Sequence, residues 1–212
     1  MRPLLFALFV TLIAPVSRAE DIAGRFDYYI LALSWSPNWC AREGDARGSP
    51  QCDADTGFGW ILHGLWPQYL SGWPEYCATE HHAPSPDLVT KMTEIMPSAS
   101  LVNHQWRKHG TCDGRTPLRY FADARHAFAS VKIPPILRRH RETITVSAAQ
   151  VEDAFLADNP ALGRDSVTVT CREGAIQEVR ICLDRETLLP RSCTGRAARD
   201  CMLDRATFAP VR

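Results

Sequence analysis

The chain has 212 residues, and its 24 basic and 24 acidic side chains cancel to a formal net charge of zero. This length suits one domain with a sizeable core. The charge balance excludes a uniformly basic protein, so any polyanion would have to be held by a local cluster of cations.

The first nineteen residues have the pattern of a secretory signal peptide. A basic tip at residues 1–3 precedes an apolar run over residues 4–15, and the small residues Ser17 and Ala19 stand just before a cleavage point after Ala19. A membrane anchor is the alternative, but the run is shorter than the roughly 20 residues that span a bilayer. No later stretch is apolar enough to cross a membrane. We therefore expect residues 1–19 to be removed.

Cleavage would leave one domain, residues 20–212, in a secreted or periplasmic location. An even number of cysteines in an exported protein predicts four disulfides, although sequence alone leaves 105 pairings open. Zinc is the alternative, but the chain has no C-x-x-C pair, so we expect neither a metal nor a cofactor. The eight cysteines are Cys40, Cys52, Cys77, Cys112, Cys171, Cys182, Cys193 and Cys201.

Strands are predicted early in the chain. Residues 26–35 (FDYYILALSW) are rich in aromatic and β-branched side chains, which is typical of a buried strand, and the segment Ser36-Pro37-Asn38 would end it. Residues 41–57, rich in Gly, Asp, Arg and Pro, predict a surface loop. The short apolar run at residues 59–62 predicts a second strand that leads into His63-Gly64.

Helices are predicted from proline boundaries, apolar periodicity and a Ser147–Gln150 capping box. A hairpin with a Glu173-Gly174 turn should follow them. The combination of helices with a mostly antiparallel sheet predicts an α+β fold: a central sheet flanked by helices in a single disulfide-bonded domain. The helices are expected at residues 86–96, 101–109, 117–131 and 148–157, and the hairpin strands at 167–171 and 175–182.

Two segments carry candidate chemistry: HGLWP, beginning at His63 at the end of a strand, and HQWRKHGTC over residues 104–112. On an ideal α-helix, with 100° between residues, the second segment has four side chains on one face and Gly110 as its end. Cys112 would anchor the helix covalently. The four residues are His104, Gln105, Lys108 and His109.

This cluster favours a phosphate site. A lone histidine is more often a satisfied core group than a catalyst, but a buried lysine beside two histidines would be costly without an anion to face. Phosphate is the natural anion.

Cleavage of RNA by its own 2′-hydroxyl needs a base for that proton, an acid for the leaving 5′-oxygen, and positive charge near the phosphoryl oxygens. Histidine titrates near neutrality, so His63 and His109 can serve as the acid–base pair, with Lys108 as the charge. Trp66 either offers a face on which a base stacks, worth roughly 1–3 kcal/mol, or packs in the core.

At these two segments the chain resembles the ribonuclease T2 family. HGLWP is similar to the first active-site segment of that family and WRKHGTC to the core of the second. YYILALSWSPNWC and EVRICLD are similar to an early and a late core strand, so the resemblance covers most of residues 26–201. Two motifs in the expected order are specific, whereas either alone would only be suggestive.

The resemblance implies roles for the matching residues. His63 would be the general acid, His109 the general base, Lys108 the residue that stabilises the pentacovalent phosphate, and His104 a phosphate-holding residue. The reaction would release 2′,3′-cyclic phosphate ends without a metal. The implied disulfides are Cys77–Cys112, Cys171–Cys201 and Cys182–Cys193, which leaves Cys40 to pair with Cys52.

Two residues depart from the family pattern. Gln105 stands where the family usually has Glu, and an amide can hydrogen-bond the phosphate or a histidine but cannot carry negative charge. We expect a weakened but active enzyme. Gln68 replaces an acidic residue that some members carry after the proline, which puts any purine preference in doubt.

The expected partner is single-stranded RNA. DNA, which lacks the 2′-hydroxyl, should stay intact, and we expect a monomer without membrane contact. One alternative is a T2-like module that binds RNA or a protein but has lost catalysis through Gln105. Another is a metal-dependent phosphodiesterase, but the sequence lacks the Asp/Glu cluster that such sites need.

Overall fold

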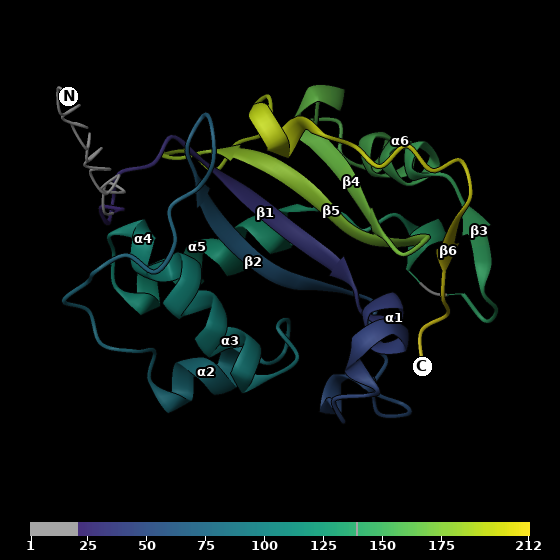
Figure 1. The fold of residues 1–212 in the computed structure, drawn as a ribbon, viewed down its shortest axis with the longest axis horizontal. Coiled ribbons are helices and arrows are strands. Elements are labelled where there is room, and N and C mark those ends of the chain that lie inside the picture. Colours follow the sequence, from purple (N-terminus) through teal and green to yellow (C-terminus); the bar gives the residue numbers. More distant parts are fainter. Residues whose placement is uncertain (1–20, 139) are drawn as a thin grey trace, which may run out of the picture.

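The computed structural model describes residues 21–138 and 140–212. The expected signal peptide lies outside the described residues. Within the described ranges, no helix is long and apolar enough to cross a membrane. The chain runs from a strand at the centre of a sheet, through a series of helices, back to the same sheet (Figure 1).

The described part contains one six-stranded sheet with β1 and β5 at its centre. β1 pairs antiparallel with β2 on one side and with β5 on the other, and β4 pairs antiparallel with β5. β6 and β3 continue from the end of β5, and the β5–β6 pairing is parallel. The strands are β1 (Tyr28–Trp35), β2 (Trp60–Gln68), β3 (Ile144–Val146), β4 (Val167–Arg172), β5 (Ala175–Asp184) and β6 (Ala206–Phe208).

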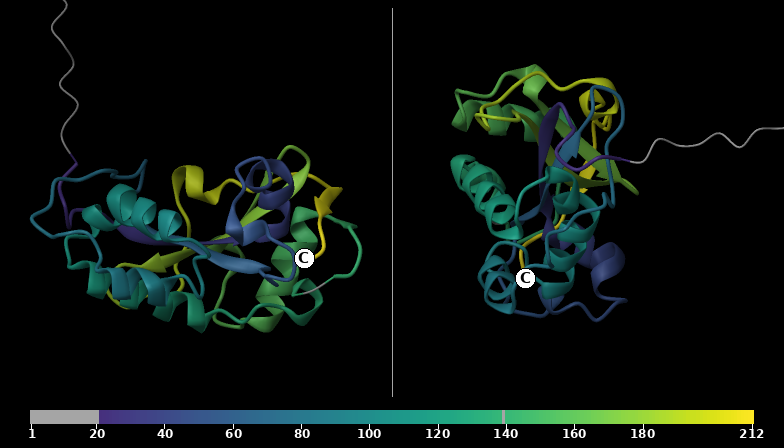
Figure 2. Two further views of the ribbon diagram at one scale, coloured as in Figure 1. Left: turned by 90° about the horizontal axis from the view of Figure 1, so that it is seen from below. Right: turned by 90° about the vertical axis from the view of Figure 1, so that its left-hand side faces the viewer.

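Helices flank this sheet at both ends. Those from the middle of the chain gather beside β2, whereas α6 packs on β4 at the opposite side (Figures 1 and 2). The expected α+β fold, with a mostly antiparallel sheet in one disulfide-bonded domain, is confirmed. The helices are α1 (Ser36–Trp39), α2 (Pro86–Met92), α3 (Ala99–Gln105), α4 (Thr111–Asp113), α5 (Pro117–Ser130) and α6 (Ala148–Asp158).

Shorter helical turns connect these elements. The turns η1 (Cys40–Gly44) and η3 (Trp106–Gly110) are π-helical. The others are 3₁₀ turns: η2 (Pro50–Cys52), η4 (Pro135–Leu137), η5 (Arg164–Ser166) and η6 (Gly195–Ala198).

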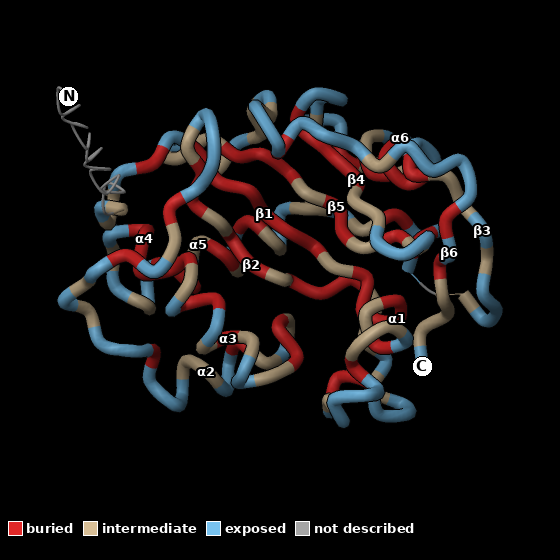
Figure 3. Tube along the Cα trace, viewed as in Figure 1, coloured by how far each residue is buried: buried red, intermediate tan, exposed pale blue. Residues whose placement is uncertain are grey.

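The two faces of β1 belong to two different hydrophobic clusters. Tyr29, Leu31, Leu33 and Trp35 alternate on one face and belong to the main core with the helices. On the other face, Tyr28, Ile30 and Ala32 form a second and smaller cluster with Cys182 and Ala197, against which Trp66 packs. Both faces of the strand are therefore covered, and every residue of β1 except Ser34 is buried (Figure 3). The functional residues described below lie on the face of the smaller cluster.

Several predicted boundaries are wrong for identifiable reasons. Ser36-Pro37-Asn38 does end β1, but it begins α1, because proline is well suited to the first turn of a helix. Residues 41–57 contain η2 and part of η1 and are not a plain loop. The helix expected over residues 86–96 ends at Met92, before a turn.

Other predictions are confirmed by local geometry. The capping box is present at α6, where Ser147 and Gln150 exchange hydrogen bonds between side chain and backbone. Glu173 and Gly174 have φ values of 52° and 79°, the left-handed conformation that a tight hairpin turn between β4 and β5 requires. The disulfides that the resemblance implied are those formed: Cys40–Cys52, Cys77–Cys112, Cys171–Cys201 and Cys182–Cys193.

Candidate active site

A β-bulge in β2 positions His63. In the pairing with β1, Ala32 lies opposite Gly64 and Leu33 lies opposite Leu62, so His63 is the extra residue on its strand. The sequence predicted that the strand would end before His63, but it continues to Gln68. A β-bulge changes the direction in which a side chain points, and such bulges are common next to active sites.

The bulge also decides which face each neighbour occupies. Leu62 and Leu65 both belong to the main core, although an odd spacing of three would normally place them on opposite faces. The extra residue restores the alternation. Consequently His63 and Trp66, also three apart, both point into the same cavity on the opposite face.

Gly64 lets the second segment approach β2 closely. A Cβ atom at this position would lie 2.3 Å from both Gln105 Oε1 and Trp66 Nε1. Those two atoms form a hydrogen bond of 2.7 Å in which the indole N–H of Trp66 donates to the Gln105 carbonyl. The absence of a side chain at Gly64 thus leaves room for the hydrogen bond that connects β2 to the α3 helix.

The second segment is α-helical only up to Gln105. It continues as the π-helical turn η3, in which the N–H of Thr111 donates to the carbonyls of both His109 and Trp106. The expectation that Gly110 ends the helix is wrong, because Gly110 keeps helical dihedrals and Gly114, at φ 82°, takes the left-handed terminal position. A Cβ on Gly110 would lie 2.4 Å from the Trp106 ring, so packing explains this glycine.

Although η3 is π-helical and not α-helical, the residues predicted from the sequence line one cavity of about 360 Å³. The Cys77–Cys112 disulfide fixes the end of the helical segment next to them. The predicted residues on its wall are His63, Trp66, His104, Gln105, Lys108 and His109, together with Gln68.

Trp66 lies between the two candidate transfer histidines. Its ring is 5.1 Å from the His63 ring, edge to face, and 5.3 Å from the His109 ring, nearly parallel. The Arg180 guanidinium stands 5.3 Å from the centroid of the same indole. Trp66 is half-buried and lines the cavity, so of the two roles expected for it, packing in the main core is not the one observed.

The surroundings of Lys108 differ from the buried position that the sequence predicted. The side chain is not deeply buried, and its ammonium already faces an anion, the Glu75 carboxylate at 3.5 Å. The backbone N–H of Tyr76 also donates to the Lys108 carbonyl, so this loop is attached to the helical segment twice. An incoming phosphate would have to share or displace Glu75.

His109 is buried and surrounded by positive charge. Burial first, and then the neighbouring Lys108, His63 and His104, lower the pKa of His109 to about 3. Its Nδ1 has no hydrogen-bond partner among the described residues. Partial burial, followed by the charges of Lys108, Arg107 and His63, also lowers the pKa of the more exposed His104. Both imidazoles are therefore neutral bases at neutral pH.

His63 has a partner that sequence reasoning missed. Its Nδ1 lies 2.5 Å from Oε1 of Glu178, a carboxylate whose side chain is 1% exposed. The other oxygen of Glu178 accepts from Nε and Nη2 of Arg180. The signal was present in EVRICLD, where two charged residues with strand spacing share one face of a strand that is otherwise buried.

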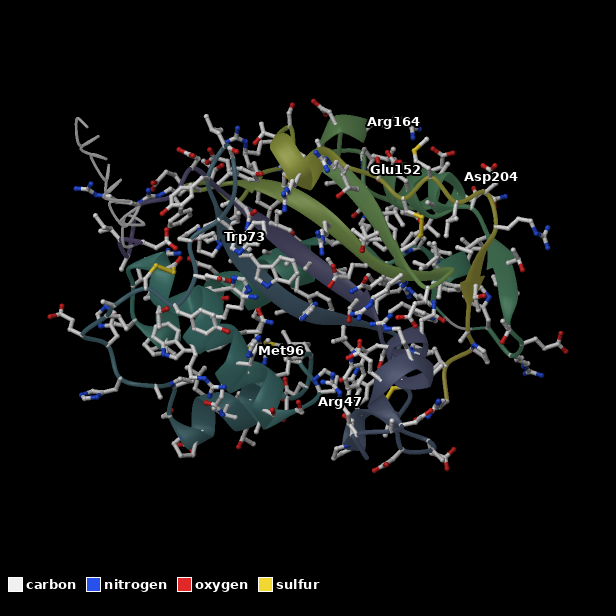
Figure 4. All side chains as sticks on the ribbon, in the orientation of Figure 1. Arg47, Trp73, Met96, Glu152, Arg164 and Asp204 are labelled. Carbon is white, nitrogen blue, oxygen red and sulfur yellow. A yellow bond between two sulfur atoms is a disulfide. The ribbon has the colours of Figure 1, made fainter. Side chains whose placement is uncertain are left out.

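Further residues missed by sequence reasoning extend the cavity. Arg180 and Arg196 add positive charge to its wall, and the exposed Trp73 adds an aromatic ring that lies over the β1–β2 part of the sheet (Figure 4). Trp73 and Arg196 also line an adjoining cavity of about 640 Å³ with Arg199. Within the described ranges, no group of three or more His, Cys, Asp or Glu side chains is arranged to hold a metal ion.

Comparisons with known proteins bear on this site. A family model described as "Ribonuclease T2 family" matches residues 26–193. A protein named "Ribonuclease" from Aeromonas hydrophila is 45% identical over 97 residues, which are 46% of this chain and 42% of the relative. The chain thus matches less than half the length of that relative.

Solved structures share the fold. The RNase-related protein from Calystegia sepium superposes with a TM-score of 0.67 at 20% identity, over 87% of this chain and 98% of the other. RNase NT, solved in complex with 5′-AMP, gives a TM-score of 0.63 at 23% identity, over 88% of this chain and 99% of the other.

Proposed function

Because the chain belongs to the ribonuclease T2 family, we propose that it is an endoribonuclease that cleaves single-stranded RNA by transphosphorylation without a metal. The observation that carries this proposal is the pair of histidines, one from a strand and one from a helix, that stand on either side of Trp66 in one cavity. A base, an acid and positive charge are then supplied by side chains alone.

The chemical step assigns one proton transfer to each histidine. His109 accepts the proton of the 2′-hydroxyl as the 2′-oxygen forms a bond to phosphorus. The bond between phosphorus and the 5′-oxygen breaks, and His63 gives a proton to that oxygen. The products are a 2′,3′-cyclic phosphate and a free 5′-hydroxyl, and each transfer contributes about 10²–10⁴-fold to the rate.

Positive charge at the phosphate comes from the helical segment and from the opposite wall. Lys108 faces the negative charge that builds up on the phosphoryl oxygens, and His104 holds the phosphate beside it. Arg180 and Arg196 extend this charge along the cavity. This local cluster is what a chain with no net positive charge needs to bind a polyanion.

The bases of the RNA have two indole rings to contact. Trp66 already touches both histidines and Arg180, so we assign it to positioning these groups at the floor of the cavity. Trp73 is 40% exposed and has the freer surface for stacking. Gln105, being 1% exposed and bonded to Trp66, acts by holding that floor and not by proton transfer.

We also propose that residues 1–19 are a signal peptide and that the mature domain works outside the cytoplasm. The support is the sequence pattern of this segment together with four disulfides, which form and persist in oxidising compartments. N-terminal sequencing of the protein recovered from culture medium or periplasm tests the cleavage point. An N-terminus other than residue 20 contradicts it.

The experiment that tests the activity uses the mature protein and an RNA oligonucleotide in the presence of EDTA. We expect cleavage to 2′,3′-cyclic phosphate and 5′-hydroxyl ends, and no cleavage of DNA of the same sequence. The His63→Ala variant is the control. RNA binding without cleavage above that control favours the binding-module alternative, and loss of cleavage in EDTA favours a metal-dependent enzyme.

A further inference from the structure

We propose that Glu178 is a positioning residue that commits His63 to the role of general acid. This inference rests on the proposed function, because it concerns how one of the two proton transfers is assigned. It adds to the reaction a residue that lies 115 positions from His63 in the chain.

The sheet brings the two residues together across β1. Leu62 and Gly64 pair with neighbouring residues of β1, and Ser34 on the same strand pairs with Glu178 of β5. β1 thus separates the strands that carry His63 and Glu178. The extra residue in β2 lets the imidazole lean over this strand, so that Nδ1 meets Oε1 at 2.5 Å.

The carboxylate is held as an anion in a buried position. Burial alone would raise the pKa of Glu178, but the hydrogen bonds and charges of His63 and Arg180 outweigh burial and lower that pKa well below its usual range. Each of its two oxygens has its own cationic or donor partner. A buried charge is tolerated when it is paired and hydrogen-bonded in this way.

An ionised Glu178 has two consequences for the acid. Its negative charge lies at Nδ1 of the ring that has to give up a proton. It also accepts the hydrogen bond from the Nδ1–H of that ring, which leaves Nε2–H as the donor toward the leaving 5′-oxygen. This is the relation between an orienting carboxylate and a histidine that also operates in serine proteases.

His109 has the opposite surroundings. Its Nδ1 has no hydrogen-bond partner among the described residues, and Gln105, which lines the same cavity, is a neutral amide bonded to Trp66. Burial and the neighbouring cations lower the pKa of His109, and Gln105 adds no negative charge to oppose them, whereas the carboxylate of Glu178 lies against the acid. The other charged or titratable groups that face the two rings are Arg180, Arg196, His104, Lys108 and, through Lys108, Glu75.

A purely structural role for Glu178 makes a different prediction. If Glu178 only neutralises Arg180 on a buried sheet face, its loss should affect all substrates equally, because the whole site would be displaced. If it acts through the acid, its loss should matter only when the leaving group needs a proton. Two substrates with different leaving groups therefore separate the two roles.

The experiment compares uridylyl-adenosine, whose 5′-oxygen must be protonated, with uridine 3′-(4-nitrophenyl phosphate), whose phenolate leaves as a stable anion. Glu178→Gln keeps the shape of the side chain and removes its charge. We expect kcat/KM to fall about 10²-fold on the dinucleotide, the lower end of what one proton-transfer group contributes, and to stay unchanged on the nitrophenyl ester. Glu178→Asp should recover part of the loss.

Glu152→Gln is the matched control. Glu152 is also a buried carboxylate paired with an arginine, Arg164, but it lies on α6 away from the cavity (Figure 4). We expect both substrates to be turned over by this variant as by the wild type. Far-UV circular dichroism of all variants confirms that the fold is kept.

The ring tautomer of His63 tests the role of Glu178 by a measurement that does not depend on enzyme activity. In the wild-type protein, ¹⁵N NMR should show the neutral ring with its proton on Nδ1. A proton on Nε2, or an equal loss on both substrates in Glu178→Gln, overturns the role of Glu178 while leaving the ribonuclease activity intact. A wild-type protein that cleaves neither substrate instead contradicts the proposed function, and the role of Glu178 falls with it.

Discussion

The two transfer histidines sit in contrasting surroundings. His63 belongs to a bulged strand, is about one-third exposed, and touches a buried carboxylate. His109 belongs to a π-helical turn, is 7% exposed, and is stacked on Trp66 among positive charges. A carboxylate thus faces one ring, whereas burial and nearby cations lower the pKa of the other.

The difference shows how two identical side chains can be given opposite tasks. An enzyme that uses a histidine as acid and another as base needs one to be charged and the other neutral at the same pH. Here Glu178 lies against His63, whereas burial and neighbouring cations lower the pKa of His109.

Removal of either histidine should have the largest effect, and the leaving group should tell them apart. His109→Ala is expected to lose about 10²–10⁴-fold in kcat on both RNA and the nitrophenyl ester, because both need the 2′-hydroxyl deprotonated. His63→Ala should lose a similar factor on RNA alone. Steady-state kinetics on both substrates measures this, and the reverse pattern would exchange the two roles.

Gly64→Ala should disrupt the contact between the two halves of the site. The added methyl group would overlap the hydrogen bond between Trp66 and Gln105, so the floor of the cavity and the helical segment must move apart. A displacement of about 1 Å can cost on the order of 10²-fold in rate. Circular dichroism should show an unchanged fold, and full activity in this variant would mean that the contact is dispensable.

The pH dependence of kcat/KM should extend far into the acidic range. The base must be neutral, and because burial and nearby cations lower the pKa of His109 to about 3, activity that depends on it should persist as the pH falls below 6.5. Activity measured between pH 3.5 and 8 tests this. An acidic limb centred near pH 6.5 would contradict it.

Gln105→Glu should move that acidic limb to higher pH. A carboxylate at residue 105 would stand in the cavity that His109 also lines, and its negative charge would raise the pKa of His109, while a Glu oxygen can still accept the Trp66 hydrogen bond. We expect a shifted profile and not the appearance of activity from zero. An unchanged profile would show that residue 105 does not sense the base.

Glu75→Gln should have the smallest effect. It releases Lys108 from its ion pair, so the phosphate no longer competes with a carboxylate. Partly exposed ion pairs of this kind contribute roughly 0.2–1 kcal/mol, so KM should fall about two- to threefold at low salt. Titration with salt should reduce the difference, and a rise in KM would mean that Glu75 holds Lys108 in place for the substrate.

The sequence predicted the parts of the fold that depend on local signals. The capping box at Ser147 and the Glu173-Gly174 turn act within a few residues, and both are found where expected. The HGLWP and WRKHGTC segments likewise identified the residues that now line the cavity. Local geometry and short motifs can be predicted from the sequence because the interacting groups are close in the chain.

What the sequence did not predict depends on pairing between distant segments. The bulge at His63 exists only in relation to the register of β1, and Glu178 reaches His63 only because β1 lies between their strands. The anion that faces Lys108 was expected to be phosphate, but the loop from Trp73 to Cys77 brings Glu75 there first. The charged pair in EVRICLD marks Glu178 as unusual, but which residue it contacts depends on the order of the strands.

The bulge in β2 makes the number of residues in this segment as important as their identity. Without the bulge, Leu62 and Leu65 would lie on opposite faces of the sheet, and so would His63 and Trp66, because both pairs are three residues apart. Deletion of Gly64 would remove the bulge and still leave both pairs on shared faces, so the loss would fall on the direction in which His63 points toward Glu178 and on the close approach of Gln105. Homologous chains can therefore vary in side chain around this segment, but loss of the bulge should mark a protein in which His63 no longer reaches the carboxylate.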